Sequence, residues 1–326
     1  MTRRIMSLAM LFLAALIAAA CVAPVAPVAP AAPAEDTHLR IALIPVLDVL
    51  PFYVAEQKSY FAAQGIQVEG VPVKSGQERD ALMQTGQVDG ELNELLTTAL
   101  FNQKTPTIKS VAIARQAYPQ APLFRVLGAP NAAVQTPADL KGVPIGIAQN
   151  TVIEYVTDRL LRAAGLDPAD IVYTEVSAIP ARFELLMNGQ LPAATLPDPL
   201  AQGAIAAGAR LIIDDAARGD ISFSVLSFRI PTLQTKPTTV RKFLVAWSQA
   251  VQDLNNDPAA FQSLMIEKGR VPEAIQGTYR MPPFPLNQAP TAAQAADIIA
   301  WLREKGLIER DIPYEELVDA SFLPAE

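Results

Sequence analysis

The chain has little of the two residue types that most often carry metal-binding and nucleophilic chemistry. Its 326 residues contain one histidine, His38, and one cysteine, Cys21. A single cysteine excludes an intrachain disulfide and a thiolate zinc site, and a single histidine excludes a multi-histidine metal site. Serine–histidine or cysteine–histidine catalysis would need His38 as its base. His38 stands at the start of the first predicted strand, where a lone histidine is typically structural or solvated.

Charged and aromatic residues are also scarce. Only 18% of the residues are charged and 6% are aromatic, whereas 51% are hydrophobic. This composition supports a sizeable core and excludes a wholly disordered chain. The net charge of −7 gives no basic surface for nucleic acid, so we expect no nucleic-acid partner.

Residues 1–20 resemble a signal peptide. Two arginines precede an apolar run that is short for a membrane span and ends in small residues. Ala18-Ala19-Ala20-Cys21 resembles a bacterial lipobox, in which the cysteine carries a lipid such as palmitate and becomes the mature N-terminus. The same alanines would also serve as an ordinary A-x-A cleavage site, leaving Cys21 as a free thiol. We expect a lipid on Cys21, which would anchor an extracytoplasmic protein to the cell membrane.

The segment after Cys21 is a proline-rich repeat, VAP-VAP-VAP-AAP-A, over residues 22–34. Proline at every third position forms neither helix nor ladder and favours extended polyproline II. At about 3.1 Å per residue this run would reach roughly 40 Å. We therefore assign residues 21–37 to a tether.

From residue 39 onward, short apolar runs alternate with stretches of helical periodicity. This alternation is typical of right-handed βαβ units built on a buried parallel sheet. In the first half we expect strands at 39–45, 66–73, 88–92 and 108–114, and helices at 50–63 and 77–84. The design returns about 100 residues later, with strands at 143–148 and 171–175 around a helix at 153–164.

The repeat predicts two α/β lobes. We expect the chain to cross between them near 122–130 and to return near 221–229. Lobe 1 would then hold residues 39–121 and 229–326, and lobe 2 residues 122–228. Helices predicted at 240–255, 258–268 and 292–305 are expected to pack back onto lobe 1.

Four segments resemble the NMT1/THI5-like solute-binding proteins, in that family's order and within residues 39–208. They are PFYVAEQKSYF…QGIQVE at 51–69, GQVDG at 86–90, TPADLKG…IG at 136–146 and AGLDPADI at 164–171. The resemblance implies a type II periplasmic-binding-protein fold: two lobes, each a mostly parallel sheet flanked by helices, joined by two crossing hinge strands. It also implies a monomeric, non-catalytic lipoprotein without a cofactor that serves an ABC permease and its ATPase.

Members of that family deliver sulfonates, nitrate, thiamine pyrimidine precursors or riboflavin. In pyrimidine-precursor members a Trp, an Asn and a His fall where this chain has Leu43, Val46 and Val49. These departures disfavour a pyrimidine ligand, and they remove the histidine that pyrimidine-synthesising homologues consume. A further departure is Ser59, where the family prefers glycine, and it alters a turn. Overall similarity is greatest to the riboflavin-binding RibY type of lipoprotein, so riboflavin is the expected transported ligand.

Ligand contacts are expected beyond the C-terminal ends of the strands, where two such lobes face each other. Aromatic rings would sandwich a flat heteroaromatic ligand, and amide side chains would supply donors and acceptors. The expected carboxylates suit hydroxyls or ring N–H groups and would repel a sulfonate or nitrate. The candidates are Asp48, Phe52, Tyr53, Gln77, Glu91, Asn93, Gln116 and Tyr118 in lobe 1, and Asn150, Thr151, Tyr155 and Asp198 in lobe 2.

Several of these residues have a structural alternative. Asp198 could cap the next helix, Tyr155 could belong to the core, and Glu91 and Asn93 could be loop residues. Trp247 and Trp301 follow helical spacing, which favours core packing over ligand stacking. No metal site is expected.

Two other functional hypotheses stay open. An enzyme on the same fold would need a carboxylate such as Asp48, Glu91 or Asp198 as its general base. A sensor subunit would have a signalling protein as its partner instead of a permease.

Overall fold

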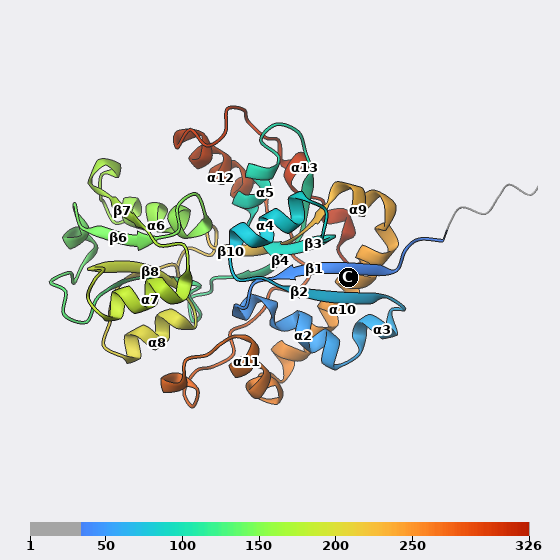
Figure 1. Ribbon diagram of the computed structural model, residues 1–326, viewed down its shortest axis with the longest axis horizontal. Helices are drawn as coiled ribbons and strands as arrows, with labels where there is room; N and C mark the ends of the chain where they lie inside the picture. The colour runs from blue at the N-terminus through green and yellow to red at the C-terminus, as the bar shows by residue number, and fades with distance from the viewer. Residues whose placement is uncertain (1–33, 326) are drawn as a thin grey trace, which may run out of the picture. The chain divides into compact units, whose positions relative to one another are not determined.

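The computed structural model describes residues 34–325, which Figure 1 colours from blue to red. The predicted signal peptide, Cys21 and all but the last residues of the predicted tether lie outside this range. Within residues 34–325, no helix is both long and apolar enough to cross a membrane.

Two five-stranded sheets organise this part of the chain. The first has the order β2-β1-β3-β10-β4, and the second has the order β7-β6-β8-β5-β9. The strands of the first sheet are β1 (His38–Leu43), β2 (Gln67–Pro72), β3 (Gly90–Asn93), β4 (Ile108–Gln116) and β10 (Phe223–Arg229). Those of the second are β5 (Phe124–Gly128), β6 (Pro144–Ile147), β7 (Val172–Glu175), β8 (Ala193–Pro197) and β9 (Arg210–Asp214).

The two sheets repeat one design, which confirms the predicted two-lobe α/β fold. In the first, β1 pairs in parallel with β2 and β3, while β10 runs antiparallel to β3 and β4. In the second, β6 pairs in parallel with β7 and β8, while β5 runs antiparallel to β8 and β9. Each sheet is therefore mixed, because the strand that follows each crossing enters its sheet in the opposite direction.

We call residues 35–116 and 223–325, built around the first sheet, lobe 1, and residues 124–214, built around the second, lobe 2. The predicted boundary at residue 228 needs correction. The strand β10 pairs with β3 and β4, so residues 223–228 belong to lobe 1. The two crossings are accordingly the short stretches 117–123 and 215–222.

Helices cover both faces of each sheet. Those of lobe 1 are α2 (Leu50–Gln57), α3 (Tyr60–Ala63), α4 (Gly76–Gln84), α5 (Leu95–Phe101), α9 (Ile230–Thr235), α10 (Pro237–Asn256), α11 (Gln262–Lys268), α12 (Ala292–Glu304) and α13 (Tyr314–Leu317). Those of lobe 2 are α6 (Val152–Ala163), α7 (Ile179–Met187) and α8 (Leu200–Ala206). In Figure 1, α6 lies on one side of the second sheet and α7 and α8 lie on the other.

The single helix predicted at 50–63 is divided into α2 and α3 at Ser59. Ser59 has a φ of 59°, in the left-handed region that favours glycine. A left-handed residue cannot continue a right-handed helix, so the chain turns there. This geometry explains why a glycine is the preferred residue at that point of the motif.

The core of lobe 1 forms where α10 packs against α2 and the first sheet. Trp247 of α10 is 3% exposed and packs near Phe243, which confirms its predicted core role. Glu35 accepts hydrogen bonds from the first-turn N–H groups of Thr238 and Thr239 at the start of α10. The chain therefore enters lobe 1 at a helix N-terminus, where a negative charge is favourable.

The helix α12 departs from the prediction because it contacts both lobes. It packs on α5 of lobe 1, and its Trp301 lies against α6 of lobe 2. Trp301 is fully buried, donates from Nε1 to Asp158 Oδ2 at 2.9 Å and meets the Tyr155 ring edge-on. Trp301 is thus a core residue, as expected, but in a contact between the lobes.

Candidate functional site

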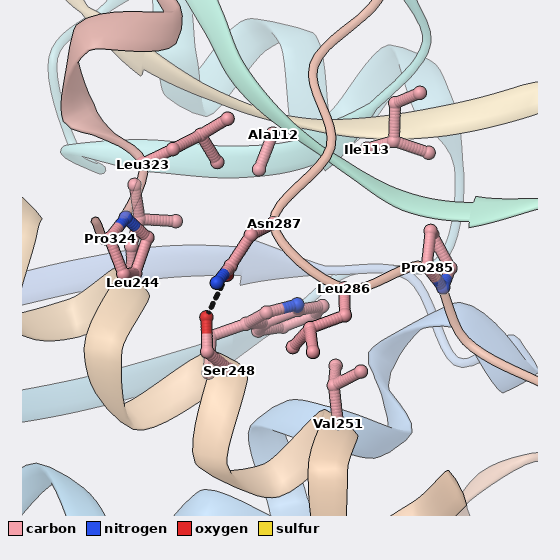
Figure 2. A pocket seen from close by; sticks show the side chains of 11 residues that line it. Ala112, Ile113, Leu244, Ser248, Val251, Pro285, Leu286, Asn287, Leu323 and Pro324 are labelled. Carbon is pink, nitrogen blue, oxygen red and sulfur yellow. Dashed lines mark hydrogen bonds between the residues drawn. The ribbon is translucent and has the colours of Figure 1, made fainter. Parts of the chain in front are cut away.

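A cavity of about 560 Å³ lies between the lobes, lined by residues of both. Its volume lies within the range of small-molecule sites, roughly 300–1,000 Å³. Gln77 of lobe 1 and Ser177 of lobe 2 approach each other here, with Nε2 and Oγ 3.5 Å apart. The described residues contain a second, apolar cavity beside Ser248 and Asn287 (Figure 2), but its volume is only about 10 Å³. That space holds a water molecule at most, so the larger cavity is the candidate site.

Three helices begin at the large cavity: α4, α6 and α7, with nine, twelve and nine residues. Ser75 caps α4 by accepting from the N–H of Glu78, and Thr151 caps α6 by accepting from that of Ile153. Among residues 34–325, no hydrogen bond uses the N–H of Gly76, Val152 or Ile179, which open these helices. Free N–H groups and the positive ends of helix dipoles attract negative charge.

Arg182 of α7 adds a buried positive charge to the lobe 2 wall. Its Nε donates to the Thr195 carbonyl at 2.8 Å, and its Nη1 donates to the Val176 carbonyl at 2.6 Å. Nη2 has no hydrogen-bond partner, and Arg182 forms no ion pair within the described part of the chain. Burial lowers the pKa of its guanidinium to about 10, so it stays charged at neutral pH.

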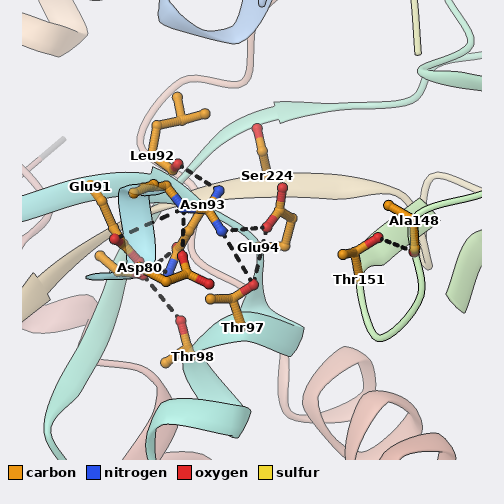
Figure 3. Close-up of polar contacts among 12 residues, drawn as sticks. Asp80, Glu91, Leu92, Asn93, Glu94, Thr97, Thr98, Ala148, Thr151 and Ser224 are labelled. Atoms are coloured by element: carbon orange, nitrogen blue, oxygen red, sulfur yellow. Dashed lines mark hydrogen bonds and ion pairs between the residues drawn. The ribbon is translucent and has the colours of Figure 1, made fainter. Parts of the chain in front are cut away.

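Arg79 of α4 lies on the lobe 1 wall among carboxylates. Its Nε is 2.8 Å from Asp80 Oδ1, and its Nη2 is 3.3 Å from Glu94 Oε2. Glu91 lies behind them, off the cavity lining, and burial raises the pKa of its carboxyl to about 7. Figure 3 shows Asp80, Glu91 and Glu94 gathered on lobe 1, with Thr151 of lobe 2 across from them. The lobe 1 wall therefore carries more negative charge than the lobe 2 wall.

Arg115 of β4 lies where the two lobes meet beneath the cavity. Its Nη1 donates to Asp48 Oδ1 at 3.1 Å, and Asp48 Oδ2 accepts from Ser224 Oγ at 2.7 Å. Across the lobes, Arg115 Nη2 lies 3.6 Å from Asp198 Oδ2. Asp198 also accepts from Arg125 and from the hydroxyl of Tyr279. Two buried arginines and two buried aspartates thus balance one another's charge.

The structure places five of the predicted site residues on the cavity lining: Asp48, Gln77, Asn150, Thr151 and Asp198. Gln77 and Thr151 stand at helix N-termini, as the expected strand–helix geometry requires. Asn150 has a φ of 59° just before α6 and is exposed. Asp198 does not cap the next helix: α8 has Pro199 at its N-cap and no side-chain cap.

The predicted aromatic residues do not line the cavity. Phe52 is 1% exposed and packs against Phe61 in the lobe 1 core. Tyr53 meets Phe52 edge-on and lies under Lys268, and Tyr118 belongs to the first crossing, where it pairs with Ala121. On a helix only one stripe faces the cavity, and these rings occupy the stripe that faces the core.

The other predicted residues are also held elsewhere. Tyr155 is 1% exposed and donates to Asp297 of α12, which corresponds to its core alternative. Gln116 ends β4 away from the lining, and Asn93 and Glu91 lie in β3, buried and hydrogen-bonded to each other at 2.8 Å. Glu91 and Asn93 are therefore strand residues rather than loop residues.

Sequence reasoning missed the three arginines of the lining, Arg79, Arg115 and Arg182. Arg115 interrupts an otherwise largely apolar strand, which was the available signal. No group of histidine, cysteine, aspartate and glutamate in residues 34–325 could hold a metal ion. The arrangement offers hydrogen-bond donors, a buried positive charge and free helix N-termini, which together can bind an oxyanion.

Comparison with protein-family models gives a match to the family described as NMT1/THI5 like, over residues 47–261. The match covers more than half of the chain. The chain belongs to the NMT1/THI5-like family. No curated protein matches it.

Solved structures of the same fold include three that bear on the NMT1/THI5-like assignment. The alkanesulfonate-binding protein SsuA of Xanthomonas axonopodis pv. citri, bound to MOPS, is 19% identical with a TM-score of 0.71, covering 89% of this chain and 98% of that one. The aliphatic sulphonate-binding protein SsuA of Escherichia coli is 17% identical with a TM-score of 0.72, covering 87% and 92%. The desulfurization enzyme DSZB is 15% identical with a TM-score of 0.66, covering 88% and 97%. These likenesses show the two-lobe periplasmic-binding-protein fold.

Proposed function

We propose that this chain is the solute-binding component of an ABC importer and holds its solute in the cavity between the lobes. The observation that carries the proposal is a cavity of about 560 Å³ that draws its lining from both lobes. Family membership and fold support it. A solute that contacts both lobes would favour their closure, and a closed protein can then be recognised by a permease.

The proposed setting follows from the N-terminal sequence. A lipid on Cys21 and a tether over residues 21–37 would hold the monomeric body at the outer face of the cell membrane. Its partners would be a permease and an ATPase. Globomycin, which blocks lipoprotein signal cleavage, should leave the uncleaved precursor to accumulate, and Cys21→Ser should abolish lipid labelling. Release of an unlabelled mature protein would favour ordinary cleavage instead.

The solute that this cavity suits best carries an oxyanion, such as a sulfonate or nitrate. Three helix N-termini face the cavity, and the Arg182 charge has no carboxylate partner among the described residues. Asp48 and Asp198 are already bound to arginines, so their charge does not repel an anion as strongly as free carboxylates would. This balance differs from the sequence-based expectation that carboxylates would reject an anion.

Riboflavin is the second candidate, and amide side chains favour it. Five line the cavity: Gln77, Gln84, Gln103, Gln149 and Asn150. They could pair with the ring edge and ribityl hydroxyls of a flavin. The rings at the cavity are those of Phe101 and Phe124, since the predicted aromatic residues lie elsewhere. A flavin would therefore depend on two phenylalanines for stacking. A thiamine pyrimidine precursor would meet the same limit.

Binding without turnover is the proposed activity. The carboxylates available as a general base are Asp48, Glu91 and Asp198. Asp48 and Asp198 accept from arginines, and Glu91 lies off the lining. An enzyme of the DSZB kind, which shares the fold, would convert its substrate, so mass analysis of solutes after incubation separates the two hypotheses. Conversion that survives replacement of all three carboxylates would exclude this form of catalysis.

A thermal-shift screen tests the proposal directly. Ethanesulfonate, taurine, nitrate, riboflavin and an aminopyrimidine would each be added to the purified protein. A ligand at 100 times its Kd raises the free energy of unfolding by about 2.7 kcal/mol, which is a clear upward shift in Tm. We expect a shift with a sulfonate or nitrate. A yellow preparation with a flavin spectrum, or a shift with riboflavin alone, would assign the cavity to riboflavin instead.

A further inference from the structure

Asp198 connects the two lobes through different atoms of one carboxylate. It follows β8 in lobe 2 and is 5% exposed. Oδ1 accepts from Arg125, which lies on the neighbouring strand β5 of the same lobe. Oδ2 accepts from the Tyr279 hydroxyl and lies 3.6 Å from Arg115 Nη2. One carboxylate oxygen therefore faces its own lobe, and the other faces lobe 1.

Tyr279 is part of lobe 1. It is 2% exposed and packs with Ile275 and Phe284 in the lobe 1 core. The same segment reaches lobe 2 again through Pro272, which fills the space where a Cβ on Gly203 of α8 would lie. The glycine thus allows α8 to approach the segment closely. Segment 271–279 is therefore a rigid extension of lobe 1 that contacts lobe 2 at its β8–α8 corner.

Charge is balanced inside each lobe, which makes separation of the lobes feasible. Asp48 pairs with Arg115 in lobe 1, and Asp198 pairs with Arg125 in lobe 2. If the lobes part, both ion pairs remain, and no buried charge loses its only partner. Only the Tyr279 hydroxyl contact and the 3.6 Å approach of Arg115 to Asp198 are lost. Both groups would then be hydrated by the water that enters the cavity.

The contact of α12 with α6 is much larger and lies on the other side of lobe 2. Trp301 is fully buried there, and Asp297 accepts from both Tyr155 and Arg159. In Figure 1, α12 adjoins the α6 side of the second sheet, whereas α8 lies on the opposite side. A large contact on one side and a small polar contact on the other are the arrangement of a pivot and a catch.

We propose that Tyr279 and Asp198 form a latch that holds the two lobes closed, while α12 and α6 form the pivot. The latch rests on the proposed function only in that the lobes must part to admit a solute. Its strength sets the fraction of closed protein before any solute binds. A hydrogen bond to a carboxylate of this kind changes such an equilibrium by about tenfold or more.

The test measures the distance between the lobes without a ligand. Spin labels are attached to Ala81→Cys in α4 and Glu184→Cys in α7, both exposed, in a Cys21→Ser background. Pulsed electron paramagnetic resonance then gives the distribution of distances. Tyr279→Phe removes the hydroxyl and keeps the ring, so we expect the ratio of closed to open protein to fall by about tenfold.

Tyr60→Phe is the matched control, because the Tyr60 hydroxyl donates to Asp253 at 2.5 Å entirely within lobe 1. It should leave the distance distribution unchanged. The latch is overturned if Tyr279→Phe gives the same distribution as its parent, if Tyr60→Phe shifts it equally, or if the parent is already fully open. Because no ligand is used, these outcomes are separate from failure of the thermal-shift screen, which would count against the proposed function.

Discussion

Glu91 and Arg79 lie close together without a hydrogen bond between them: Glu91 Oε2 is 3.9 Å from Arg79 Nε. No group in the described part of the chain donates to that oxygen, and the Glu91 side chain is fully buried. Arg79 instead makes closer ion pairs with Asp80 and Glu94. Burial therefore outweighs the attraction of Arg79 and raises the pKa of Glu91 to about 7.

This relationship predicts a pH-dependent stability. Between its ordinary pKa of 4.5 and about 7, Glu91 holds a proton in the folded protein but has lost it in the unfolded chain. The stability that Glu91 contributes is therefore complete below 4.5 and is lost as the pH rises to about 7. The loss amounts to at most about 3 kcal/mol. Glu91→Gln cannot ionise, so its free energy of unfolding should gain on that of the parent by this amount between pH 4.5 and 8.

Urea unfolding at a series of pH values measures the difference. Glu69→Gln serves as the control, because Glu69 is half-exposed in its ion pair with Arg40. Its difference from the parent should stay below about 1 kcal/mol at every pH. A Glu91→Gln difference that does not change with pH would show that Glu91 is ionised throughout this range.

The fold could be predicted because its signals are local. Apolar runs and helical periodicity gave the alternation of strands and helices, and the spacing of Trp247 and Trp301 gave their burial. Strand direction was less accessible. The direction of β10 depends on pairing with β3 and β4, which lie more than 100 residues earlier. For the same reason the sequence placed α12 on lobe 1 and missed its contact with α6.

The site was predicted only at helix starts. Gln77 and Thr151 follow strands directly, so the strand–helix geometry carries them to the cavity. The helix start says less about the next residues, because a 100° turn per residue decides between core and cavity, as Phe52 and Tyr155 illustrate. The arginines were missed for another reason: the partner of Arg115, Asp48, is 67 residues away in sequence. Such pairs become visible only once the chain is folded.

Arg182 should affect the binding of an anion more than the binding of a neutral solute. For any oxyanion found in the thermal-shift screen, we expect Arg182→Gln to raise the Kd about tenfold or more, because a buried positive charge is lost. Arg182→Lys, which retains a charge, should raise it less. Isothermal titration calorimetry measures both, with Arg210→Gln on the exposed start of β9 as the control. Equal weakening of anionic and neutral ligands would indicate a purely structural role.

Gly90 should not tolerate a side chain. A Cβ there would lie 2.7 Å from Phe228 Cδ1 and 2.9 Å from the Ser227 carbonyl oxygen on the neighbouring strand. Because backbone is part of the obstacle, the strands β3 and β10 would have to shift. We expect Gly90→Ala to lower the free energy of unfolding by about 1–3 kcal/mol.

Gly277 is the matched control, since nothing lies within 4 Å of a Cβ built on it. Gly277→Ala should change stability by less than about 1 kcal/mol, and in the stabilising direction if its backbone suits alanine. Thermal and urea unfolding compare the two variants. Equal effects would contradict the steric explanation for Gly90.

Asp215 holds the two crossings together and is fully buried. It accepts from the N–H of Leu123 at 2.8 Å and of Phe124 at 2.9 Å, where the first crossing enters lobe 2. It also accepts from the hydroxyl of Ser222, where the second crossing returns to lobe 1. One carboxylate therefore satisfies three donors from both crossings, and burial raises its pKa to about 6.

Asp215→Asn should be among the most destabilising single-atom changes in the chain. The amide keeps one acceptor oxygen and turns a new donor toward donors, so at least one buried N–H or O–H is left without a partner. We expect a loss of about 2–4 kcal/mol, since each unsatisfied group costs about 1–3 kcal/mol and a charged acceptor is lost as well. Asp214→Asn is the neighbouring control, because Asp214 is half-buried and accepts only from Ala216. Urea unfolding should place it within about 1 kcal/mol of the parent. If both variants lost equal stability, the crossings would be held by their backbone hydrogen bonds, such as that of the Ala117 N–H to the Ser222 carbonyl, rather than by Asp215.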